Sequence, residues 1–424
     1  MLRGRSRAPL AVLTALVVAE AAVLLLRPRH GVIEPVPVRA QSYFSASQIE
    51  RAQDFRDGQL LLFAAGLTVQ IGILFALVRR PPLVLRRRWP RPYVAGAATG
   101  AALVVALTVA ALPLDAVARR RAVDVGLVTQ SWNGWAVDVV KSLGINAVLA
   151  ATGAAVVLGL IARYPRRWWL PGAVAVVAMG AAFEFVGPVV LDPVFNSYTE
   201  LPAGQTRSDV LAVARRAGVK VDHVYEVDAS RRTTAVNAYV TGLGATKRVV
   251  LYDNLIHDFS RDETRVVVAH ELGHVHYRDV PRGLLFLLVV APFGMFAVQA
   301  LSEALRGRGR GRGPFVYASI GPRTGPRVPA PRVLPVIALS LGLMSGAITV
   351  VSNSLSRRVE ARADSFALQK TGASEAFISF ERKVTVRNVV DPDPPGWVNV
   401  LLGTHPTTVQ RIGAAKAYER SSGN

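Results

Sequence analysis

Seven apolar runs divide the chain, and each is long enough to cross the hydrocarbon core of a bilayer. They occupy residues 8–26, 59–78, 93–113, 145–162, 168–190, 282–303 and 333–352. A membrane-spanning helix needs about 20 predominantly apolar residues, because each backbone polar group must be satisfied within the segment. The pattern therefore predicts a mainly α-helical, polytopic membrane protein with seven transmembrane helices.

Two polar regions separate and follow these runs. Residues 191–281 alternate short apolar strands with helical stretches, and 353–424 begin as a charged helix and end in a tail. Neither region is large enough to bury a comfortable core alone. The two spans in 282–352 return the chain to the same side, so we expect the two polar regions to form one small α+β domain at one membrane face. Residues 1–190 then form transmembrane helices 1 to 5.

The composition supports a membrane protein and narrows the chemistry. Hydrophobic residues make up 51%, charged residues 19%, and the mean hydropathy is +0.32, which excludes an ordinary soluble protein. The net charge of +21 comes mainly from arginine clusters between apolar runs, where they orient spans, so no nucleic-acid partner is expected. The Arg-Gly tract 306–313 is interpreted in the same way, with RNA binding as the alternative. Without cysteine, a metal must be held by His, Asp or Glu.

The sequence H-E-L-G-H at 270–274 is the strongest chemical signal. On a helix, His270 and His274 share one face, so both imidazoles can bind one zinc ion while Glu271 reaches a water molecule beside it. The alternative is a surface helix with two solvated histidines. The apolar stretch 265–269 favours a buried helix and therefore a metal site.

A third ligand is expected on the helix that follows the seventh span. Glu360 and Asp364 are four residues apart and share a helical face. At about 1.5 Å per residue, Glu360 and the two histidines lie within roughly 10 Å of the same height above the bilayer. Two histidines and one glutamate form the thermolysin-like, or gluzincin-type, zinc site, with Asp364 orienting an imidazole. The alternative is a surface helix with alternating charge.

Together these residues resemble a family of integral-membrane zinc metallopeptidases, which includes the type I CAAX prenyl proteases and the bacterial heat-shock membrane protease. The likeness extends over four ordered motifs, at 191–204, 236–255, 360–364 and 403–412. Seven spans are similar to the CAAX prenyl protease branch, and this resemblance implies a barrel of helices around a large chamber.

The resemblance implies a role for each matching residue. One Zn²⁺ per chain would be held by the three ligands, and Glu271 would act as general base. His405 would donate a hydrogen bond to the oxyanion of the tetrahedral intermediate. Asn237 and Ala238 would begin an edge strand that pairs with an extended peptide substrate. Arg411 would bind substrate by steadying a carboxylate, or would be a structural surface residue.

The sequence thus predicts a zinc metalloendopeptidase in the cell membrane that hydrolyses peptides or membrane proteins. Cleavage after a prenylated cysteine is implied by the resemblance, and cleavage of membrane or secreted peptides is the broader statement. The alternative from another class is a non-catalytic seven-helix scaffold or transporter with a vestigial metal site. The oligomeric state is not readable from the residues.

The arginine distribution also predicts an orientation. Nineteen Arg and Lys residues lie in the N-terminal segment and in the connections 79–92, 163–167 and 304–332, whereas 27–58 and 114–144 contain five and four. The positive-inside rule assigns the nineteen to the cytoplasm and the zinc site to the opposite side. The family resemblance implies a zinc site that faces the cytosol.

Overall fold

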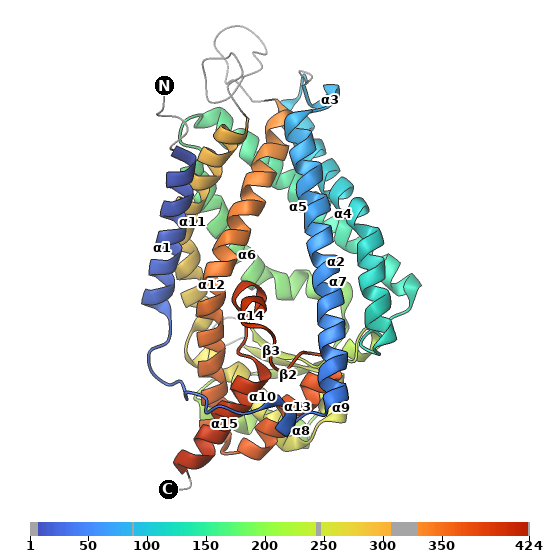
Figure 1. Cartoon of the computed structure of the whole chain (residues 1–424), viewed down its shortest axis with the longest axis vertical. Coiled ribbons are helices and arrows are strands. Elements are labelled where there is room, and N and C mark those ends of the chain that lie inside the picture. Colours follow the sequence, from blue (N-terminus) through green and yellow to red (C-terminus); the bar gives the residue numbers. More distant parts are fainter. Residues whose placement is uncertain (1–6, 87–88, 243–246, 307–329, 423–424) are drawn as a thin grey trace.

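The computed structural model describes residues 7–86, 89–242, 247–306 and 330–422. It has two halves, an elongated bundle of long helices and a smaller domain of short helices and strands at one end (Figure 1). Within the Arg-Gly tract 306–313, only Arg306 is described. The role assigned to the rest of that tract lies outside the described residues.

Among the described residues, seven helices are long and apolar enough to cross a membrane, which confirms the predicted number of spans. Four of them run well beyond the apolar pattern, because α2 begins at Ala46, α4 continues to Asp124, α5 begins at Trp132 and α12 continues to Thr371. The helical backbone does not stop where the apolar run ends, since the polar extension of α12 packs against the smaller domain. The helices are α1 (Arg7–Leu26), α2 (Ala46–Arg79), α4 (Pro92–Asp124), α5 (Trp132–Arg163), α6 (Trp169–Val190), α11 (Asp279–Leu305) and α12 (Leu334–Thr371).

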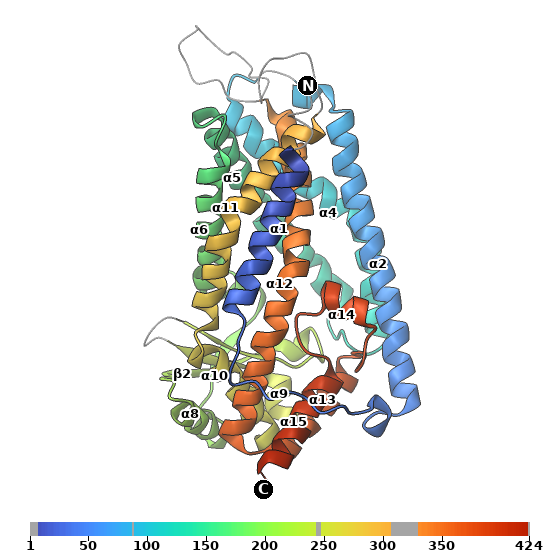
Figure 2. The ribbon, with the colours of Figure 1, turned by 60° about the vertical axis from the view of Figure 1, so that its left-hand side comes forward.

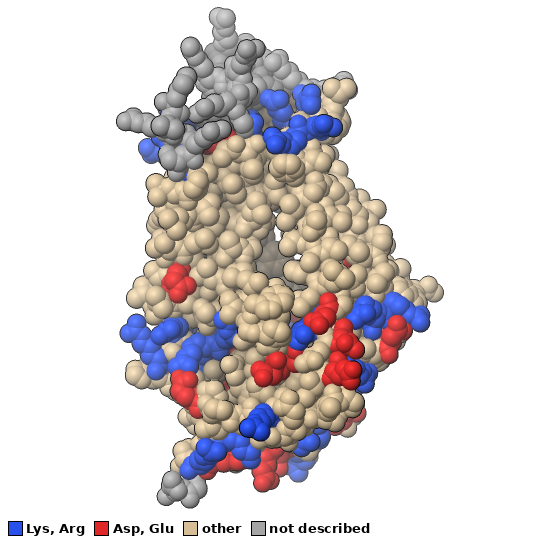
Figure 3. Space-filling model, in the orientation of Figure 1, with Lys and Arg blue, Asp and Glu red and all other residues tan. Residues whose placement is uncertain are grey.

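Six of these helices form a closed ring. Neighbours pack in the order α2, α4, α5, α6, α11 and α12, and α12 returns to α2, while α1 lies against α11 and α12. The long helices diverge toward the smaller domain (Figure 2). The space-filling view shows an opening in the apolar wall with a hollow behind it (Figure 3). This arrangement agrees with the predicted barrel around a chamber.

The smaller domain contains one four-stranded sheet. Its strands are β1 (Tyr198–Glu200), β2 (His223–Val227), β3 (Ala238–Thr241) and β4 (Arg248–Tyr252), in the order β1-β2-β4-β3. β2 and β4 are parallel, and the outer strands are antiparallel to their neighbours. β3 therefore lies at an edge, with β4 as its partner.

Helices cover the sheet and complete the domain. They are α8 (Gln205–Ala217), α9 (Asp253–Asp258), α10 (Arg261–His276), α13 (Ser374–Arg387), α14 (Gly396–Leu402) and α15 (Thr408–Ser422). Short helical turns connect the longer elements at α3 (Leu83–Arg86), α7 (Asp192–Phe195), η1 (Ala40–Ser42), η2 (Ala229–Arg231) and η3 (Pro331–Val333).

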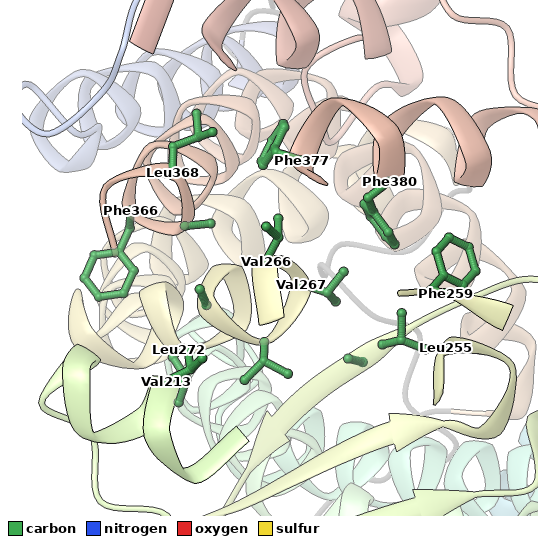
Figure 4. Close-up of a cluster of buried hydrophobic side chains, with 14 of the residues drawn as sticks. Val213, Leu255, Phe259, Val266, Val267, Leu272, Phe366, Leu368, Phe377 and Phe380 are labelled. Atoms are coloured by element: carbon green, nitrogen blue, oxygen red, sulfur yellow. The ribbon is translucent and has the colours of Figure 1, made fainter. Parts of the chain in front are cut away.

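One hydrophobic core joins the two polar regions of the sequence. Val266 and Leu272 from α10 pack with Leu255 of the earlier segment and with Phe366 and Phe377 from the segment after the last span (Figure 4). Burying apolar side chains from both segments stabilises them only when they are together. The domain therefore assembles at one end of the bundle, because α11 and α12 bring its two parts back to the same place.

The connection between α1 and α2 runs across this domain as an extended segment, here called the strap (residues 27–45). The backbone N–H of Ile33 donates to Ser365 Oγ on α12 at 2.8 Å, and that of Val36 donates to the carbonyl of Gly413 on α15 at 3.2 Å. The strap ties the polar end of α12 to the C-terminal helix α15, and each of the two contacts joins residues more than 300 positions apart.

Candidate metal centre and active site

Three side chains from two helices converge at the junction of the domain and the bundle. His270 and His274 lie on α10 and Glu360 on α12, and one ligand atom from each lies within 4.8 Å of the others. His270 Nε2 is 3.3 Å from His274 Nε2 and 3.2 Å from Glu360 Oε2. The structure thus brings together the residues that the two sequence motifs predicted as ligands.

Helix α10 has local features that place its histidines. A capping box begins the helix, in which Ser260 Oγ accepts from the N–H of Glu263 and the Ser260 N–H donates to Glu263 Oε2. The apolar side chains that follow bury the helix in the domain core. Gly273 allows close approach of α12, since a Cβ there would lie 3.4 Å from the Cα of Ala363 and 3.2 Å from Phe366. Glycine between the histidines therefore sets the distance between the two ligand helices.

Each imidazole is held from behind by a carboxylate. His270 Nδ1–H donates to Asp364 Oδ1 at 2.8 Å, and His274 Nδ1–H donates to Asp279 Oδ2 at 3.0 Å. These bonds leave both Nε2 atoms facing each other and Glu360. Two imidazole nitrogens and one carboxylate oxygen, oriented in this way, fit a divalent metal such as zinc.

Asp279 was not among the residues predicted from the sequence. It begins α11, after a turn in which Arg278 has a φ of 55° and ends the H-E-L-G-H helix. The motif helix and the sixth span are therefore separate helices. The only sequence signal was an acidic residue five positions after His274, and spacing alone did not identify its partner.

Behind His270, Asp364, Arg411 and Glu381 form a buried network of ion pairs. The guanidinium of Arg411 donates to Asp364 through Nε at 2.8 Å, and its Nη1 lies 2.8 Å from Glu381 Oε1. The side chain of Arg411 is only 17% exposed, so the geometry favours a structural role over the predicted contact with substrate. Burial lowers the pKa of Arg411, but the two carboxylates outweigh it and leave that pKa raised.

Glu381 on α13 is a second residue that sequence reasoning missed. It is 2% exposed and belongs to no motif. Burial raises the pKa of its carboxyl to about 7, because Arg411, which acts to lower it, is shared with Asp364. Only the packing of α13 against α15 shows that this glutamate borders the site.

A cavity of about 780 Å³ opens beside the cluster, with His274 and Glu360 among the residues that line it. Glu271 lines it, and burial raises the pKa of this carboxyl above its usual value. The cavity is also lined by Glu184 from α6, by Tyr239 to Thr241 of β3 and by Gly242, which follows that strand. A substrate group in this cavity can contact Glu271 and the β3 segment at the same time.

The predicted peptide-binding pair lies just before this part of β3. Asn237 is exposed, and its Oδ1 accepts from the N–H of Ala238 at 2.9 Å. Ala238 is buried and pairs with Leu251 of β4. The residues of this strand that line the cavity begin one position later, at Tyr239.

His405 reaches the site from the loop between α14 and α15. Its Nε2 lies 3.3 Å from Glu360 Oε2, and its Nδ1 lies 2.9 Å from Thr404 Oγ1. Although the side chain remains 59% exposed, surrounding protein atoms lower the pKa of His405. The imidazole therefore stands at the edge of the ligand cluster, where a neutral ring can donate one hydrogen bond.

Comparison with known proteins agrees with this geometry. A model of Peptidase family M48 matches residues 200–419, which is more than half of the chain and contains all three predicted ligands. The chain belongs to peptidase family M48. This confirms the family resemblance inferred from the four motifs and shows that the protein is a metallopeptidase.

Relatives of this M48 peptidase extend the likeness to the membrane half. It is 29% identical over 385 residues to the uncharacterized metalloprotease YhfN of Bacillus subtilis, covering 90% of this chain and 88% of that protein. It is 32% identical to CAAX prenyl protease 1 of Saccharomyces cerevisiae, over 36% of this chain and 34% of that protein. The crystal structure of S. mikatae Ste24p shares its fold, with a TM-score of 0.71 at 18% identity over 96% of this chain and 98% of the other.

The M48 peptidase is therefore a multi-pass membrane protein with its ligand cluster at one end of the bundle. Described arginines around α3 and between α5 and α6 lie at the other end, and Figure 3 shows Lys and Arg gathered there above an apolar band. These described arginines and the cluster of His270, His274 and Glu360 therefore lie on opposite sides of that band.

Proposed function

We propose that this protein is a zinc-dependent endopeptidase that cleaves extended peptides delivered from the membrane half of the molecule. The observation that supports it most directly is the convergence of His270, His274 and Glu360 beside a cavity that Glu271 lines. Membership in a peptidase family gives no support to the alternative of a non-catalytic scaffold or transporter.

The three ligands would hold one Zn²⁺ per chain. Zinc bound there supplies Lewis acidity, which polarises a scissile carbonyl and makes a water molecule acidic near neutral pH. Asp364 and Asp279 fix the two imidazoles so that their Nε2 atoms face each other, where the ion would be held. Arg411 in turn donates to Asp364 and is itself paired with Glu381, so we assign Arg411 to orientation of the site.

Glu271 would act as the general base. Its carboxylate takes a proton from the attacking water and passes it to the nitrogen of the departing amine, so that one group serves both halves of the reaction. His405 would donate a hydrogen bond to the oxygen that becomes negative as the carbonyl is attacked. Both side chains border the same ligand cluster from different elements.

The substrate would bind as an extra strand along β3. This strand is at the edge of its sheet, and its residues from Tyr239 onward line the cavity next to Glu271. Backbone hydrogen bonds at a sheet edge recognise an extended peptide regardless of much of its sequence. Asn237 and Ala238 would position the beginning of this edge.

Substrate chemistry is tested with two matched peptides. Purified protein should contain one zinc per chain and hydrolyse a detergent-soluble peptide, and a chelator should abolish both. Cleavage of a prenylated cysteine peptide but not of the same peptide without the prenyl group would indicate the activity named for the yeast relative. Cleavage of both would indicate general cleavage of membrane or secreted peptides. Zinc-loaded protein that cleaves neither peptide would contradict the proposal.

A further inference from the structure

The short helix α14 leads directly into the segment that contains His405. It leaves α13 through a proline-rich stretch, rises beside α12, and is followed by Gly403 and Thr404 (Figure 1). His405 therefore has its backbone on a loop, while Glu360, its neighbour in the site, is on the long helix α12. Its position relative to Glu360 depends on what holds the end of α14.

Arg357 of α12 holds that end. Its Nη1 donates to the carbonyl oxygen of Asn399 at 2.8 Å and to that of Gly403 at 2.7 Å. Asn353, one turn earlier on α12 and 3% exposed, donates from Nδ2 to the carbonyl of Leu401 at 2.8 Å. Leu401 lies in the last turn of α14 and Gly403 follows it, where intrahelical donors run out, while the Asn399 carbonyl also accepts from the Gly403 N–H at 3.0 Å.

The contacts of Arg357 are specific to this segment. Within the part of the chain that the structure describes, no carboxylate lies at salt-bridge distance from Arg357. The next residue, Arg358, instead pairs with Glu34 of the strap. A partly buried guanidinium whose hydrogen bonds go to the end of α14 and to the residue after it fixes the start of the loop that follows. Because Arg357 is one turn before Glu360 on the same helix, it ties the loop to a metal ligand.

Close packing at Gly403 strengthens the connection. A Cβ at this position would lie 2.7 Å from the carbonyl oxygen of Asn399 and 2.2 Å from its side-chain Oδ1. The carbonyl that Arg357 grips would therefore be displaced by any side chain at residue 403. Gly403 and Arg357 therefore both keep the Asn399 carbonyl in place, and Gly403 is only two residues before His405.

We infer that Arg357 is a positioning residue that sets His405 against Glu360 by clamping the end of α14 to α12. This inference rests on the proposed role of His405 as an oxyanion donor. Such a donor acts only over a narrow range of distance, and a misplacement of about 1 Å can cost roughly 100-fold in rate. The clamp thereby connects the rigid ligand helix to a catalytic group on a loop.

The test compares Arg357→Ala with Arg358→Ala in the purified full-length protein. Arg357→Ala should lower kcat for a model peptide about 10- to 100-fold, with KM and one zinc per chain unchanged, because the clamp touches neither ligand nor peptide. Arg358→Ala, which removes a more exposed pair on the same helix, should retain the parental kcat. Gly403→Ala should reproduce the loss without altering α12, should Arg357→Ala fold poorly.

A double variant separates positioning from general damage. In a His405→Ala background, adding Arg357→Ala or Gly403→Ala should cause no further loss, because the group that the clamp positions is already gone. A further loss in the double variant, or the parental kcat in both Arg357→Ala and Gly403→Ala, would overturn the clamp. Parental activity of His405→Ala alone would instead refute the role proposed for His405.

Discussion

His274 and Asp279 lie five residues apart in sequence but on different helices, and the imidazole Nδ1–H donates to the aspartate Oδ2 at 3.0 Å. Arg362 from α12 also contacts Asp279, so this carboxylate links both ligand helices. The contact makes His274 the counterpart of His270, which has the same relationship with Asp364.

Asp279→Asn should weaken zinc binding while leaving the three ligands in place. An amide oxygen still accepts the bond but no longer supplies the negative charge that makes the imidazole more basic, and loss of such a partner typically costs about 10- to 100-fold in metal affinity. Competition with a chromogenic chelator measures the effect. Affinity equal to that of the parent would show that Asp279 serves only the fold.

Glu360→Ala should release most of the zinc, as should His270→Ala and His274→Ala. Each removes one of three protein ligands, and the remaining pair holds the ion poorly. Mass spectrometry of the purified variants gives the zinc content per chain. If Glu360→Ala keeps full zinc and Asp364→Ala loses it, the two carboxylates have exchanged roles.

Glu271→Gln separates chemistry from metal binding. The side chain is proposed to touch the water and not the metal, so zinc content and folding should be retained. An amide cannot accept the proton at neutral pH, and general-base catalysis is worth about 10²- to 10⁴-fold, so peptide hydrolysis should fall by at least about 100-fold. Parental hydrolysis by this variant would rule out the peptidase mechanism.

Glu381→Gln should change how stability depends on pH. Burial raises the pKa of Glu381 to about 7, above its usual value of 4.5. The folded state therefore retains a proton that the unfolded state releases, and this group's contribution to stability falls as pH rises between those values. Glutamine has no carboxyl proton to lose. The Tm of the variant minus that of the parent should therefore be larger at pH 8 than at pH 5.

The matched control is Glu375→Gln, an exposed glutamate in the first turn of the same helix. Its Tm difference from the parent should be the same at both pH values. A parallel shift of the Glu381→Gln and parental curves would mean that Arg411 keeps Glu381 ionised throughout.

A reporter fused after Asn424 tests the orientation. By the positive-inside rule, the arginine-rich connections should face the cytoplasm. The C-terminal tail and the ligand cluster should then lie outside it. A phosphatase that is active only outside the cytoplasm should then be active in the fusion. Activity of a cytoplasmic reporter at the same position would favour the orientation implied by the family.

Much of the fold follows from local pattern. The seven spans are apolar runs of sufficient length, and the pairing of His270 with His274 follows from the helical repeat. Even Glu360 could be placed, because two rigid helices between the polar regions make distance along the chain a measure of height above the bilayer.

Contacts that depend on how helices pack against one another were decided by the tertiary structure. Asp279, Glu381 and Arg357 belong to no local repeat, and each meets its partner only because α10, α12 and the C-terminal helices are brought together. Arg411 illustrates the limit most clearly, since its motif indicated importance while only burial between Asp364 and Glu381 showed what it contacts. Sequence by itself determined which chemistry this protein has, because ligand types and helical spacing are local properties. The orientation of those ligands depends on side chains distant in sequence, and only the packed domain places them.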